Sequence, residues 1–436
     1  MEFYGRQNEQ NTLMEIERKS SENAQFTMLI GRRRIGKTTL LLETFKGKKV
    51  LYFFVSRNSE RVLCQQFQEL AEKEIGLKIY GTISSFSDLF GFLLDYAKSQ
   101  QYTLIIDEFQ EFDRINPAIY SDIQKQWDLN KDKIRLNLIV CGSVYSLMTK
   151  IFENRKEPLF GRLTAKINLK PFTVATVKQI LNDYNSNYSG EDLLCLYLLS
   201  GGVPQYISLL MNAKATTKRK MLATVFQTGS PFLTEGKDIL ISEFGRDYAT
   251  YFAILQLISQ GKTRQSEIDS IIDKNTGAYL QNLELDFSVI TKKKPLFSKP
   301  NSRNSVWEIE DNFLRFWFRF IASNQSLLET GRFDRIFEIL ERDYSQYSGL
   351  VLERYFLQKY REEETVTIVG QFWDRKSENE IDLIALDELN KTAVIAEVKM
   401  NKTKINLNVL QQKATVIAKE LQNYNCDYIG LSLEDM

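Results

Sequence analysis

The segment LIGRRRIGKTTLLL, residues 29–42, limits the fold of this chain more than any other stretch. An apolar run leads into Gly31, and Gly36, Lys37 and Thr38 follow at the spacing G-x-x-x-x-G-K-[ST]. Glycines let such a loop curl so that its N–H groups face phosphate, the lysine reaches the β and γ oxygens, and the hydroxyl ligates Mg²⁺. The sequence therefore predicts a strand, a phosphate-binding loop and a helix, in this order.

We expect the whole loop and the start of its helix to hold ATP with Mg²⁺. Three consecutive arginines exceed what phosphate binding requires. They can steer ATP, contact a helical lid, or pair with acids across a subunit boundary, and the sequence does not choose among these roles. The residues assigned to the nucleotide are Gly31, Arg32, Arg33, Arg34, Ile35, Gly36, Lys37, Thr38 and Thr39.

An acidic pair ends another apolar run farther along the chain. The stretch LIIDEFQEF, residues 104–112, places Asp107 and Glu108 at a strand end. A lone Asp-Glu pair there is more often a solvated loop, but together with a phosphate-binding loop it predicts a Walker B motif. We expect Asp107 to hold Mg²⁺ together with Thr38, and Glu108 to be the catalytic residue that orients or deprotonates the attacking water.

Length and composition limit what the rest of the chain can do. At 436 residues the chain is too long for one compact core. Its 57 basic and 56 acidic side chains give a net charge of +1, so nucleic-acid binding requires a local basic patch. Histidine is absent, and the four cysteines stand far apart at Cys64, Cys141, Cys195 and Cys426. Zinc sites of the usual types, disulfide frameworks and Ser-His catalysis are therefore not expected.

The apolar pattern predicts a multidomain α/β protein. Short apolar runs at 24–30, 49–55, 102–108 and 137–143 alternate with amphipathic segments, as in a parallel sheet between helices. The chain lacks a long apolar run and a signal-peptide pattern, so we expect a cytoplasmic protein with no membrane partner. The predicted segments are an ATPase core (1–170), a helical lid (171–235), a winged helix-turn-helix (236–312), a helical linker (313–345) and an α/β domain (346–436).

Several ordered motifs over residues 1–320 resemble the archaeal-type AAA+ ATPases of the ORC/Cdc6-like and STAND-like group. They are FYGRQNEQNTL, GRRRIGKTTLL, LIIDEFQ, IVCGSVYSLM, PLFGR and SGGVPQY. The resemblance implies that Ser143 binds near the γ-phosphate as sensor 1, although a serine there also suits a helix cap. It further implies that Arg162 is a catalytic arginine finger acting on a neighbouring subunit, and hence a nucleotide-dependent homo-oligomer; a solvated loop arginine is the alternative. No sensor-2 arginine stands beside SGGVPQY, which departs from that pattern.

A basic stretch in the predicted wing is the main sign of a DNA partner. Five cations, with no acid among them, surround Phe297. Such a hairpin can neutralise DNA phosphates without reading sequence, whereas a solubilising charged turn is the alternative. The preceding helix GAYLQNLELDFS is acidic and suits base reading poorly. The five cations are Lys292, Lys293, Lys294, Lys299 and Arg303.

The stretch NEIDLIALDELNKTAVIAEVKM, residues 379–400, predicts a two-stranded hairpin with an acidic cluster. Glu397 and Lys399 are two residues apart and so share one strand face. If the hairpin closes symmetrically about Leu389 and Asn390, Asp382 lies opposite Glu397. Two facing carboxylates repel unless a cation lies between them, so we predict Mg²⁺ or Mn²⁺ there, with Lys399 balancing phosphate charge.

This arrangement resembles the PD-(D/E)xK nuclease fold. The order GLVLERYF, GQFWDRKSENEIDLIAL and AVIAEVKM is, more narrowly, similar to archaeal-type ATPases with a C-terminal nuclease-like domain called DUF234. The resemblance implies that Glu353 joins Asp382 and Glu397 as a metal ligand, and that Asp382, Glu397 and Lys399 are catalytic. An ordinary sheet in which Lys399 pairs with Glu397, or an inert nuclease relic, is the alternative. We expect Gln411, Gln412 and Lys413, on the next helix, to contact the nucleic-acid backbone.

Two functions are consistent with these patterns. The first is an ATPase that couples nucleotide state to DNA binding and to metal-dependent DNA cleavage. The second is a nucleotide-gated regulatory or scaffold ATPase whose nuclease-like domain is inert. The cellular pathway, the preferred DNA structure and the oligomer size cannot be read from the sequence.

Overall fold

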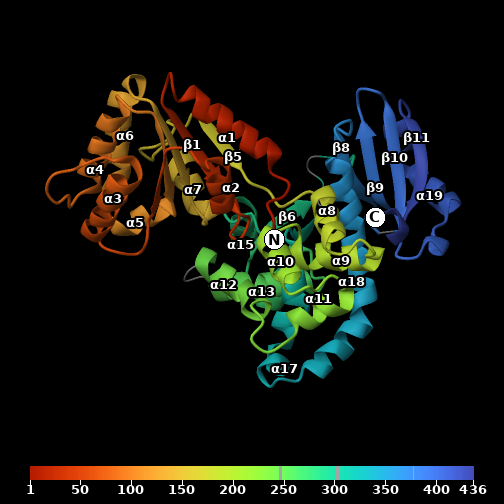
Figure 1. The fold of residues 1–436 in the computed structure, drawn as a ribbon. Coiled ribbons are helices and arrows are strands. Elements are labelled where there is room, and N and C mark those ends of the chain that lie inside the picture. Colours follow the sequence, from red (N-terminus) through yellow and green to blue (C-terminus); the bar gives the residue numbers. More distant parts are fainter. Residues whose placement is uncertain (245–247, 300–301, 303, 377) are drawn as a thin grey trace. The chain divides into compact units, whose positions relative to one another are not determined.

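The computed structural model describes residues 1–244, 248–299, 302, 304–376 and 378–436, and the chain forms two compact units (Figure 1). The smaller unit is Arg6–Lys170, and the larger combines Met1–Gly5 with Pro171–Met436. Over these described ranges, no helix has the length and apolar character needed to cross a membrane. The finer division into five segments stays a prediction.

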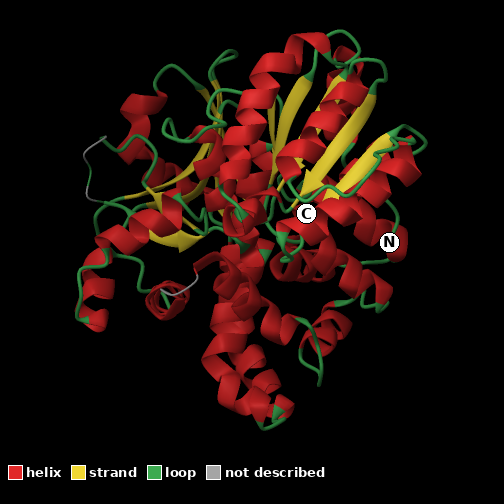
Figure 2. Cartoon of the chain, turned by 90° about the vertical axis from the view of Figure 1, so that its left-hand side faces the viewer, coloured by secondary structure: helices red, strands yellow, loops and turns green. Residues whose placement is uncertain are grey.

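The smaller unit is an α/β domain built on a five-stranded sheet, whose strands run side by side (Figure 2). Its neighbouring strands are all parallel, in the order β2-β3-β4-β1-β5. The four apolar runs are thus confirmed as strands, whereas the fifth strand was not predicted. The strands are β1 (Gln25–Ile30), β2 (Val50–Phe54), β3 (Tyr102–Asp107), β4 (Leu136–Cys141) and β5 (Ala165–Asn168).

Every residue of β3 and β4 is buried, so both faces of the sheet are covered, as in a parallel sheet between helices. A large aromatic core lies under the helices, where the ring of Phe53 stacks on that of Phe67 with centroids 4.0 Å apart. The helices are α1 (Gln7–Lys19), α2 (Lys37–Thr44), α3 (Glu60–Ile75), α4 (Phe86–Ala97), α5 (Phe112–Ile115), α6 (Ala118–Asn130) and α7 (Tyr145–Glu153).

The strand order places the predicted nucleotide residues together. In a parallel sheet the carboxyl ends of all strands share one edge, where ligands bind. The loop after β1, Asp107 at the end of β3 and Ser143 just after β4 all lie at that edge. Because β4 runs between β1 and β3, Ser143 comes between the phosphate-binding loop and the acidic pair.

The larger unit begins with a series of short helices. The first helix, α8, is capped from two sides, since the backbone N–H of Val174 donates to Glu362 at 2.9 Å and that of Thr176 donates to Thr173 at 3.1 Å. The helices are α8 (Val174–Tyr184), α9 (Gly190–Ser200), α10 (Pro204–Asn212), α11 (Lys218–Val225), α12 (Phe232–Phe244), α13 (Tyr248–Ser259), α14 (Gln265–Ile272) and α15 (Gly277–Leu285).

A two-stranded antiparallel hairpin follows α15. It consists of β6 (Ile290–Lys293) and β7 (Val306–Ile309). Three helices followed by a hairpin is the order predicted from the sequence, and the reading of this order as a winged helix stays a proposal. Arg303, one of the five predicted cations, lies outside the described residues.

The segment predicted as a helical linker carries several buried aromatic side chains. Phe313, Phe316, Trp317 and Phe320 are all buried. The helix expected at 334–344 continues without a break to Arg361, past the predicted start of the last domain, because its apolar positions stay buried along its length. The elements are α16 (Asn312–Phe316), a π-helical turn (Trp317–Ile321), α17 (Gln325–Glu329) and α18 (Phe333–Arg361).

A mixed four-stranded sheet ends the chain, in the order β11-β10-β9-β8 (Figure 1). The pairs β8–β9 and β9–β10 are antiparallel, whereas β10–β11 is parallel. An apolar cluster joins this sheet to α19 through Ile384, Ile395 and Leu410. The elements are β8 (Ile368–Trp373), β9 (Glu380–Asp387), β10 (Thr392–Val398), α19 (Leu407–Ala414), α20 (Ala418–Leu421) and β11 (Asn425–Leu431).

Candidate active sites

The loop after β1 has the backbone of a phosphate-binding loop. A Cβ at Gly31 would lie 2.7 Å from the carbonyl oxygen of Leu169, so only glycine fits there. Gly36 has a φ of 86°, in the left-handed region that glycine adopts without steric cost, and α2 begins at the next residue. The first N–H groups of a helix have no partner within it and favour an anion. The loop therefore presents donors where phosphate would bind.

Lys37 lies within this loop and is only 8% exposed. Its ammonium donates to the carbonyl oxygens of Gly31 at 2.8 Å and of Arg32 at 3.3 Å. These contacts hold the Lys37 ammonium inside the loop, where the motif predicts that it binds phosphate. Among the other residues assigned to the nucleotide, Ile35 is buried under the loop, and Arg33, Arg34 and Thr39 are exposed.

Asp107 is the centre of a hydrogen-bond network at the strand edge and is 4% exposed. Its Oδ2 accepts from the Thr38 hydroxyl at 2.9 Å and from the Tyr52 phenol at 2.6 Å. Its Oδ1 accepts from the N–H of Glu108 at 2.9 Å and from the thiol of Cys141 at 3.1 Å. The structure thus brings together the two predicted magnesium ligands, Thr38 and Asp107.

Tyr52 and Cys141 were not predicted as site residues. Burial and the neighbouring Asp107 carboxylate raise the pKa of the Tyr52 phenol and of the Cys141 thiol, so both stay protonated and can donate. Tyr52 lies on β2, beside β3, and only the strand order shows that it reaches Asp107. The sequence carries no signal for this contact.

Glu108 has a φ of 55°, in the left-handed region that is uncommon for a residue with a side chain. Its Oε2 accepts from the Ser143 hydroxyl at 2.8 Å and from the Gln110 amide at 2.5 Å. The side chain of Ser143 therefore contacts the predicted catalytic carboxylate. The helix-cap alternative does not hold, because α7 begins after Val144 without a side-chain cap.

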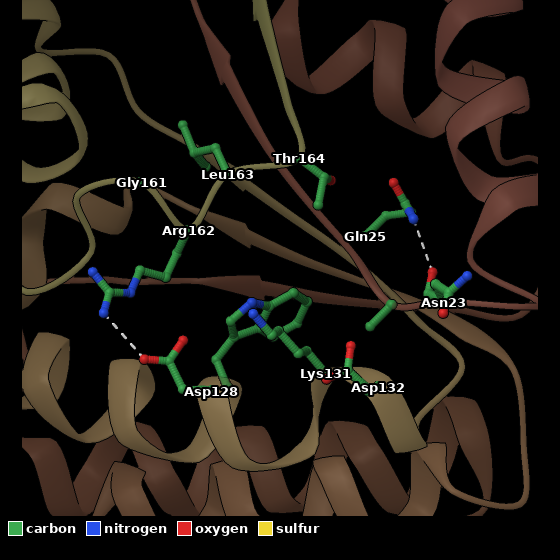
Figure 3. Close-up of a pocket in the computed structure, with 11 residues that line it drawn as sticks. Asn23, Gln25, Asp128, Lys131, Asp132, Gly161, Arg162, Leu163 and Thr164 are labelled. Atoms are coloured by element: carbon green, nitrogen blue, oxygen red, sulfur yellow. Dashed lines mark hydrogen bonds and ion pairs between the residues drawn. The ribbon is translucent and has the colours of Figure 1, made fainter.

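Arg162 lies at the other edge of the sheet from the phosphate-binding loop. It lines a cavity of about 550 Å³ together with Gln25 and Thr164, which mark the amino ends of β1 and β5 (Figure 3). One guanidinium nitrogen lies 3.1 Å from the carboxylate of Asp128. The six residues of β1 separate the two edges by about 20 Å. Arg162 therefore does not reach the nucleotide loop of its own chain.

In the C-terminal sheet, the predicted hairpin register is confirmed. The paired residues run from Thr392 opposite Asp387 to Ala396 opposite Leu383. One further step of this register places Asp382 opposite Glu397. Both carboxylates are nearly buried, at 7% and 9% exposure.

Lys399 lies between these two carboxylates. Its ammonium is 3.2 Å from Asp382 Oδ2 and 3.6 Å from Glu397 Oε1. Asp382 also accepts from the N–H of Val398 at 2.8 Å, and Glu397 accepts from the N–H of Asn406 at 3.0 Å. Burial lowers the pKa of Lys399, but the carboxylates outweigh this effect and raise it, so the ammonium stays charged.

Glu353, from α18, faces the same cluster. Burial, and then the charges of Asp382 and Glu380, raise its pKa to about 8. The side-chain amide of Gln371 donates to the Glu353 carboxylate at 3.2 Å. Carboxylate oxygens are the ligands that Mg²⁺ and Mn²⁺ prefer, so the chemistry of these donors fits such a cation. Among the described residues, however, no group of three acidic, cysteine or histidine side chains is already arranged around one metal position.

The predicted basic patch in the hairpin is only partly available. The ammonium of Lys293 is paired with the half-buried carboxylate of Glu308, which lies on the facing strand and was missed because it is distant in sequence. Arg315 pairs with the same carboxylate, and Arg354 of α18 does so at 2.7 Å. Lys293 is therefore a structural residue, which corrects the view that no acid accompanies these cations. Lys292 keeps its ammonium over the ring of Trp307, 5.2 Å from the centroid.

The helix after β10 leaves its polar face accessible. Gln411 and Gln412 are exposed on α19, and Lys413 is half-buried. The charge of Lys413 opposes the rise in the pKa of Glu380 that burial and Asp382 cause. Lys413 therefore lies on the same side of the sheet as the acidic cluster, and contact of the three residues with nucleic acid stays a prediction.

Two family models match this chain. Residues 3–210 match an ATPase domain predominantly from Archaea, and residues 317–420 match DUF234, a family of archaeal and bacterial proteins of unknown function. The first half of the chain is thus similar to archaeal ATPase domains, and its last third is similar to DUF234. The first match supports ATP hydrolysis, and the DUF234 match includes Glu353, Asp382, Glu397 and Lys399.

Individual relatives agree with this assignment. An uncharacterized protein of Methanocaldococcus jannaschii is 29% identical over 393 residues, which cover 88% of this chain and 84% of the relative. A Walker-type ATPase of Pyrococcus abyssi shares the fold, with a TM-score of 0.55 at 20% identity over 73% of this chain and 96% of that one. The ORC2 protein of Aeropyrum pernix is more distant, with a TM-score of 0.46 at 14% identity over 76% and 95%. The Pyrococcus abyssi protein thus shares its fold with most of this chain.

Proposed function

We propose that this protein couples ATP binding and hydrolysis in its ATPase domain to DNA binding and metal-dependent DNA cleavage through its DUF234 domain. One observation supports the proposal above others: a single chain carries two separate clusters suited to phosphate and a divalent cation. The first joins Thr38 to Asp107, and the second joins Asp382 and Glu397 through Lys399.

In the ATPase domain, each residue has one role. Lys37 and the first N–H groups of α2 bind the β- and γ-phosphates. Thr38 and Asp107 would hold Mg²⁺, and the ion would neutralise charge on the phosphates. Glu108 orients the attacking water and accepts its proton, while Ser143 keeps one oxygen of Glu108 in place and lies near the γ-phosphate.

In the DUF234 domain, the carboxylates of Glu353, Asp382 and Glu397 would hold Mg²⁺ or Mn²⁺. The cation would polarise the phosphate and lower the pKa of a bound water. Lys399 would balance charge on the phosphate while a water oxygen forms a bond to phosphorus and releases a proton to solvent. The P–O bond to the leaving sugar breaks, and that sugar oxygen takes up a proton from solvent. The neighbouring carboxylates outweigh the effect of burial and keep Lys399 charged for this role.

Full-length protein is expected to cut DNA when supplied with Mg²⁺ or Mn²⁺. The panel comprises plasmid, linear and branched DNA, each with and without ATP, followed on gels. Lys399→Ala should lower cleavage at least about 100-fold, because it removes the cation that faces the phosphate. Lys404→Ala is the matched control, since Lys404 is exposed nearby. Intact DNA under every condition would contradict the proposal.

The observation that Lys399 occupies the space between Asp382 and Glu397 also favours a second function. In this alternative the protein is a nucleotide-gated regulatory or scaffold ATPase, and the lysine replaces the metal in an inert domain. The same panel decides between the two functions. Cleavage that Lys399→Ala abolishes while ATP turnover persists excludes the scaffold.

Arg162 is expected to act on the nucleotide of a neighbouring copy, because it lies at the edge of the sheet away from its own loop. Arg162→Ala and Lys37→Ala should each turn over ATP poorly, the first for lack of the finger and the second for lack of bound nucleotide. When the two variants are mixed, the rate of ATP turnover should exceed the sum of their separate rates. The Lys37→Ala subunits still supply Arg162 to the intact nucleotide sites of the Arg162→Ala subunits. Turnover equal to the sum, measured by phosphate release, would rule out action in trans.

A further inference from the structure

A polar cavity of about 780 Å³ lies in the larger unit, and its lining residues belong to neither candidate active site. The wall comes from the start of α14, from the β6–β7 hairpin, and from the turn between β8 and β9. A cavity of this size takes a small ligand or one to two nucleotides, since ligand pockets are typically about 300–1,000 Å³. It is too small for a duplex.

Three cations line this cavity: Arg264, Lys292 and Arg375. Within the described ranges, none of the three has a carboxylate within ion-pair distance; Lys292 contacts the ring of Trp307 instead. The one acidic lining residue, Asp269, already accepts from the N–H and the hydroxyl of Thr276, at 2.7 and 2.6 Å. Three cations therefore face one carboxylate among the described lining residues, so the cavity keeps a net positive charge, and this favours an anionic ligand.

Neutral donors complete the lining. The side chains of Gln265 and Ser266 line the cavity from the first turn of α14. The amide of Asn304 comes from the hairpin side. Three separated cations together with amide and hydroxyl groups suit a ligand with more than one phosphate, as a polynucleotide backbone has.

The hairpin side of the cavity is fixed to the C-terminal sheet. The N–H of Leu296 donates to the carbonyl oxygen of Gln371 at 2.8 Å, and the amide of Asn304 donates to that of Trp373 at 3.3 Å. A Cβ at Gly370 would lie 2.6 Å from the side chain of Leu296, so this contact requires glycine. The cavity and the sheet that carries the acidic cluster thus belong to one framework.

The turn that carries Arg375 leads directly into the acidic cluster. Its neighbour Asp374 accepts from the N–H groups of Lys376 and Glu378, each at 3.0 Å, which defines the turn. Strand β9 begins at Glu380, and Asp382 lies two residues along it, about 7 Å away, on the same face. A chain of phosphates leaving Arg375 would therefore come to Asp382 within a few nucleotides.

We propose that this cavity binds the phosphodiester backbone of a single nucleic-acid strand, through Arg264, Lys292 and Arg375, and directs that strand to Asp382 and Lys399. The direction of the strand rests on the proposed cleavage function, whereas binding in the cavity does not. DNA and RNA strands share the backbone chemistry that these residues recognise.

Binding of fluorescein-labelled 12-nucleotide strands to full-length protein tests the proposal, measured by anisotropy in EDTA without ATP. The triple variant Arg264→Gln, Lys292→Gln, Arg375→Gln should bind the DNA strand at least tenfold more weakly. The slope of log Kd against log salt should fall by about two, since each phosphate contact to a single strand contributes about 0.7. A control with equal loss of charge, Arg219→Gln, Lys220→Gln, Lys419→Gln, should bind as the wild type, because these residues are exposed elsewhere.

Two further arms keep the result decisive. Arg264→Lys should keep most of the affinity, because it retains the charge, and the triple variant should melt at the wild-type temperature, because its replaced side chains have no described ion pair. The triple variant should lose as much affinity for RNA strands as for DNA strands, and it should lose less affinity for a blunt duplex. Unchanged strand binding in the triple variant, or a loss confined to the duplex, would overturn the inference. Because EDTA and the lack of ATP suppress both chemical steps, failure to cleave DNA leaves this test intact.

Discussion

Lys37→Ala is expected to abolish ATP binding, with an affinity at least about 100-fold weaker than that of the wild type. Hydrogen bonds to charged groups contribute about 1.5–3 kcal/mol each, and a lysine that contacts two phosphate groups loses at least two of them. Lys37 is buried in the curl of the loop, so no solvent-exposed cation replaces it. Isothermal titration with ATP and Mg²⁺ measures the loss directly.

Lys46→Ala is the matched control for this change. Lys46 lies just after α2, is exposed, and belongs to no predicted site. Its variant should bind ATP as the wild type does. Retained ATP affinity in Lys37→Ala would mean that the loop after β1 is not the nucleotide site.

Glu108→Gln is expected to stop hydrolysis while leaving ATP affinity within about threefold of wild type. The amide has the same size as the carboxylate and can still contact Ser143, but it cannot accept a proton from water. General base catalysis typically contributes about 10²–10⁴-fold, and turnover should fall by that factor. Single-turnover phosphate release and ATP titration, run on the same preparation, separate the two effects.

The neighbouring acid Glu111 gives the control for this second change. Its carboxylate lies 3.1 Å from Arg57, on the next turn of the chain after Glu108. Glu111→Gln should hydrolyse ATP at the wild-type rate. Unchanged turnover in Glu108→Gln would show that another carboxylate activates the water.

The nucleotide site was largely predictable because its signals are local. The spacing from Gly31 to Thr38 and the pair Asp107–Glu108 each lie within a few residues of a buried strand. The register of Asp382 and Glu397 was predictable as well, since a tight turn fixes how a hairpin closes. Strand β5 was missed because it is short and half exposed, so it lacks the apolar run that marks the other strands.

Contacts between distant parts of the chain were not predictable. Tyr52 meets Asp107 through sheet order, and Glu308 meets Lys293 across a hairpin whose pairing no local pattern gives. Gln110 follows the acidic pair closely, but its contact with Glu108 was not predicted. Charge runs are ambiguous for this reason, because a lysine that looks free in sequence can be paired in space.

Helix α18 carries two adjacent residues that face different partners. Glu353 lies in the acidic cluster of the sheet, and Arg354 is bound to Glu308 of the hairpin. Successive side chains on a helix are set about 100° apart, so both contacts hold only at one angle of the helix about its own axis. The two contacts therefore fix the rotation of α18 about its axis. A movement of the β6–β7 hairpin that rotated α18 would move the Glu353 carboxylate away from Asp382.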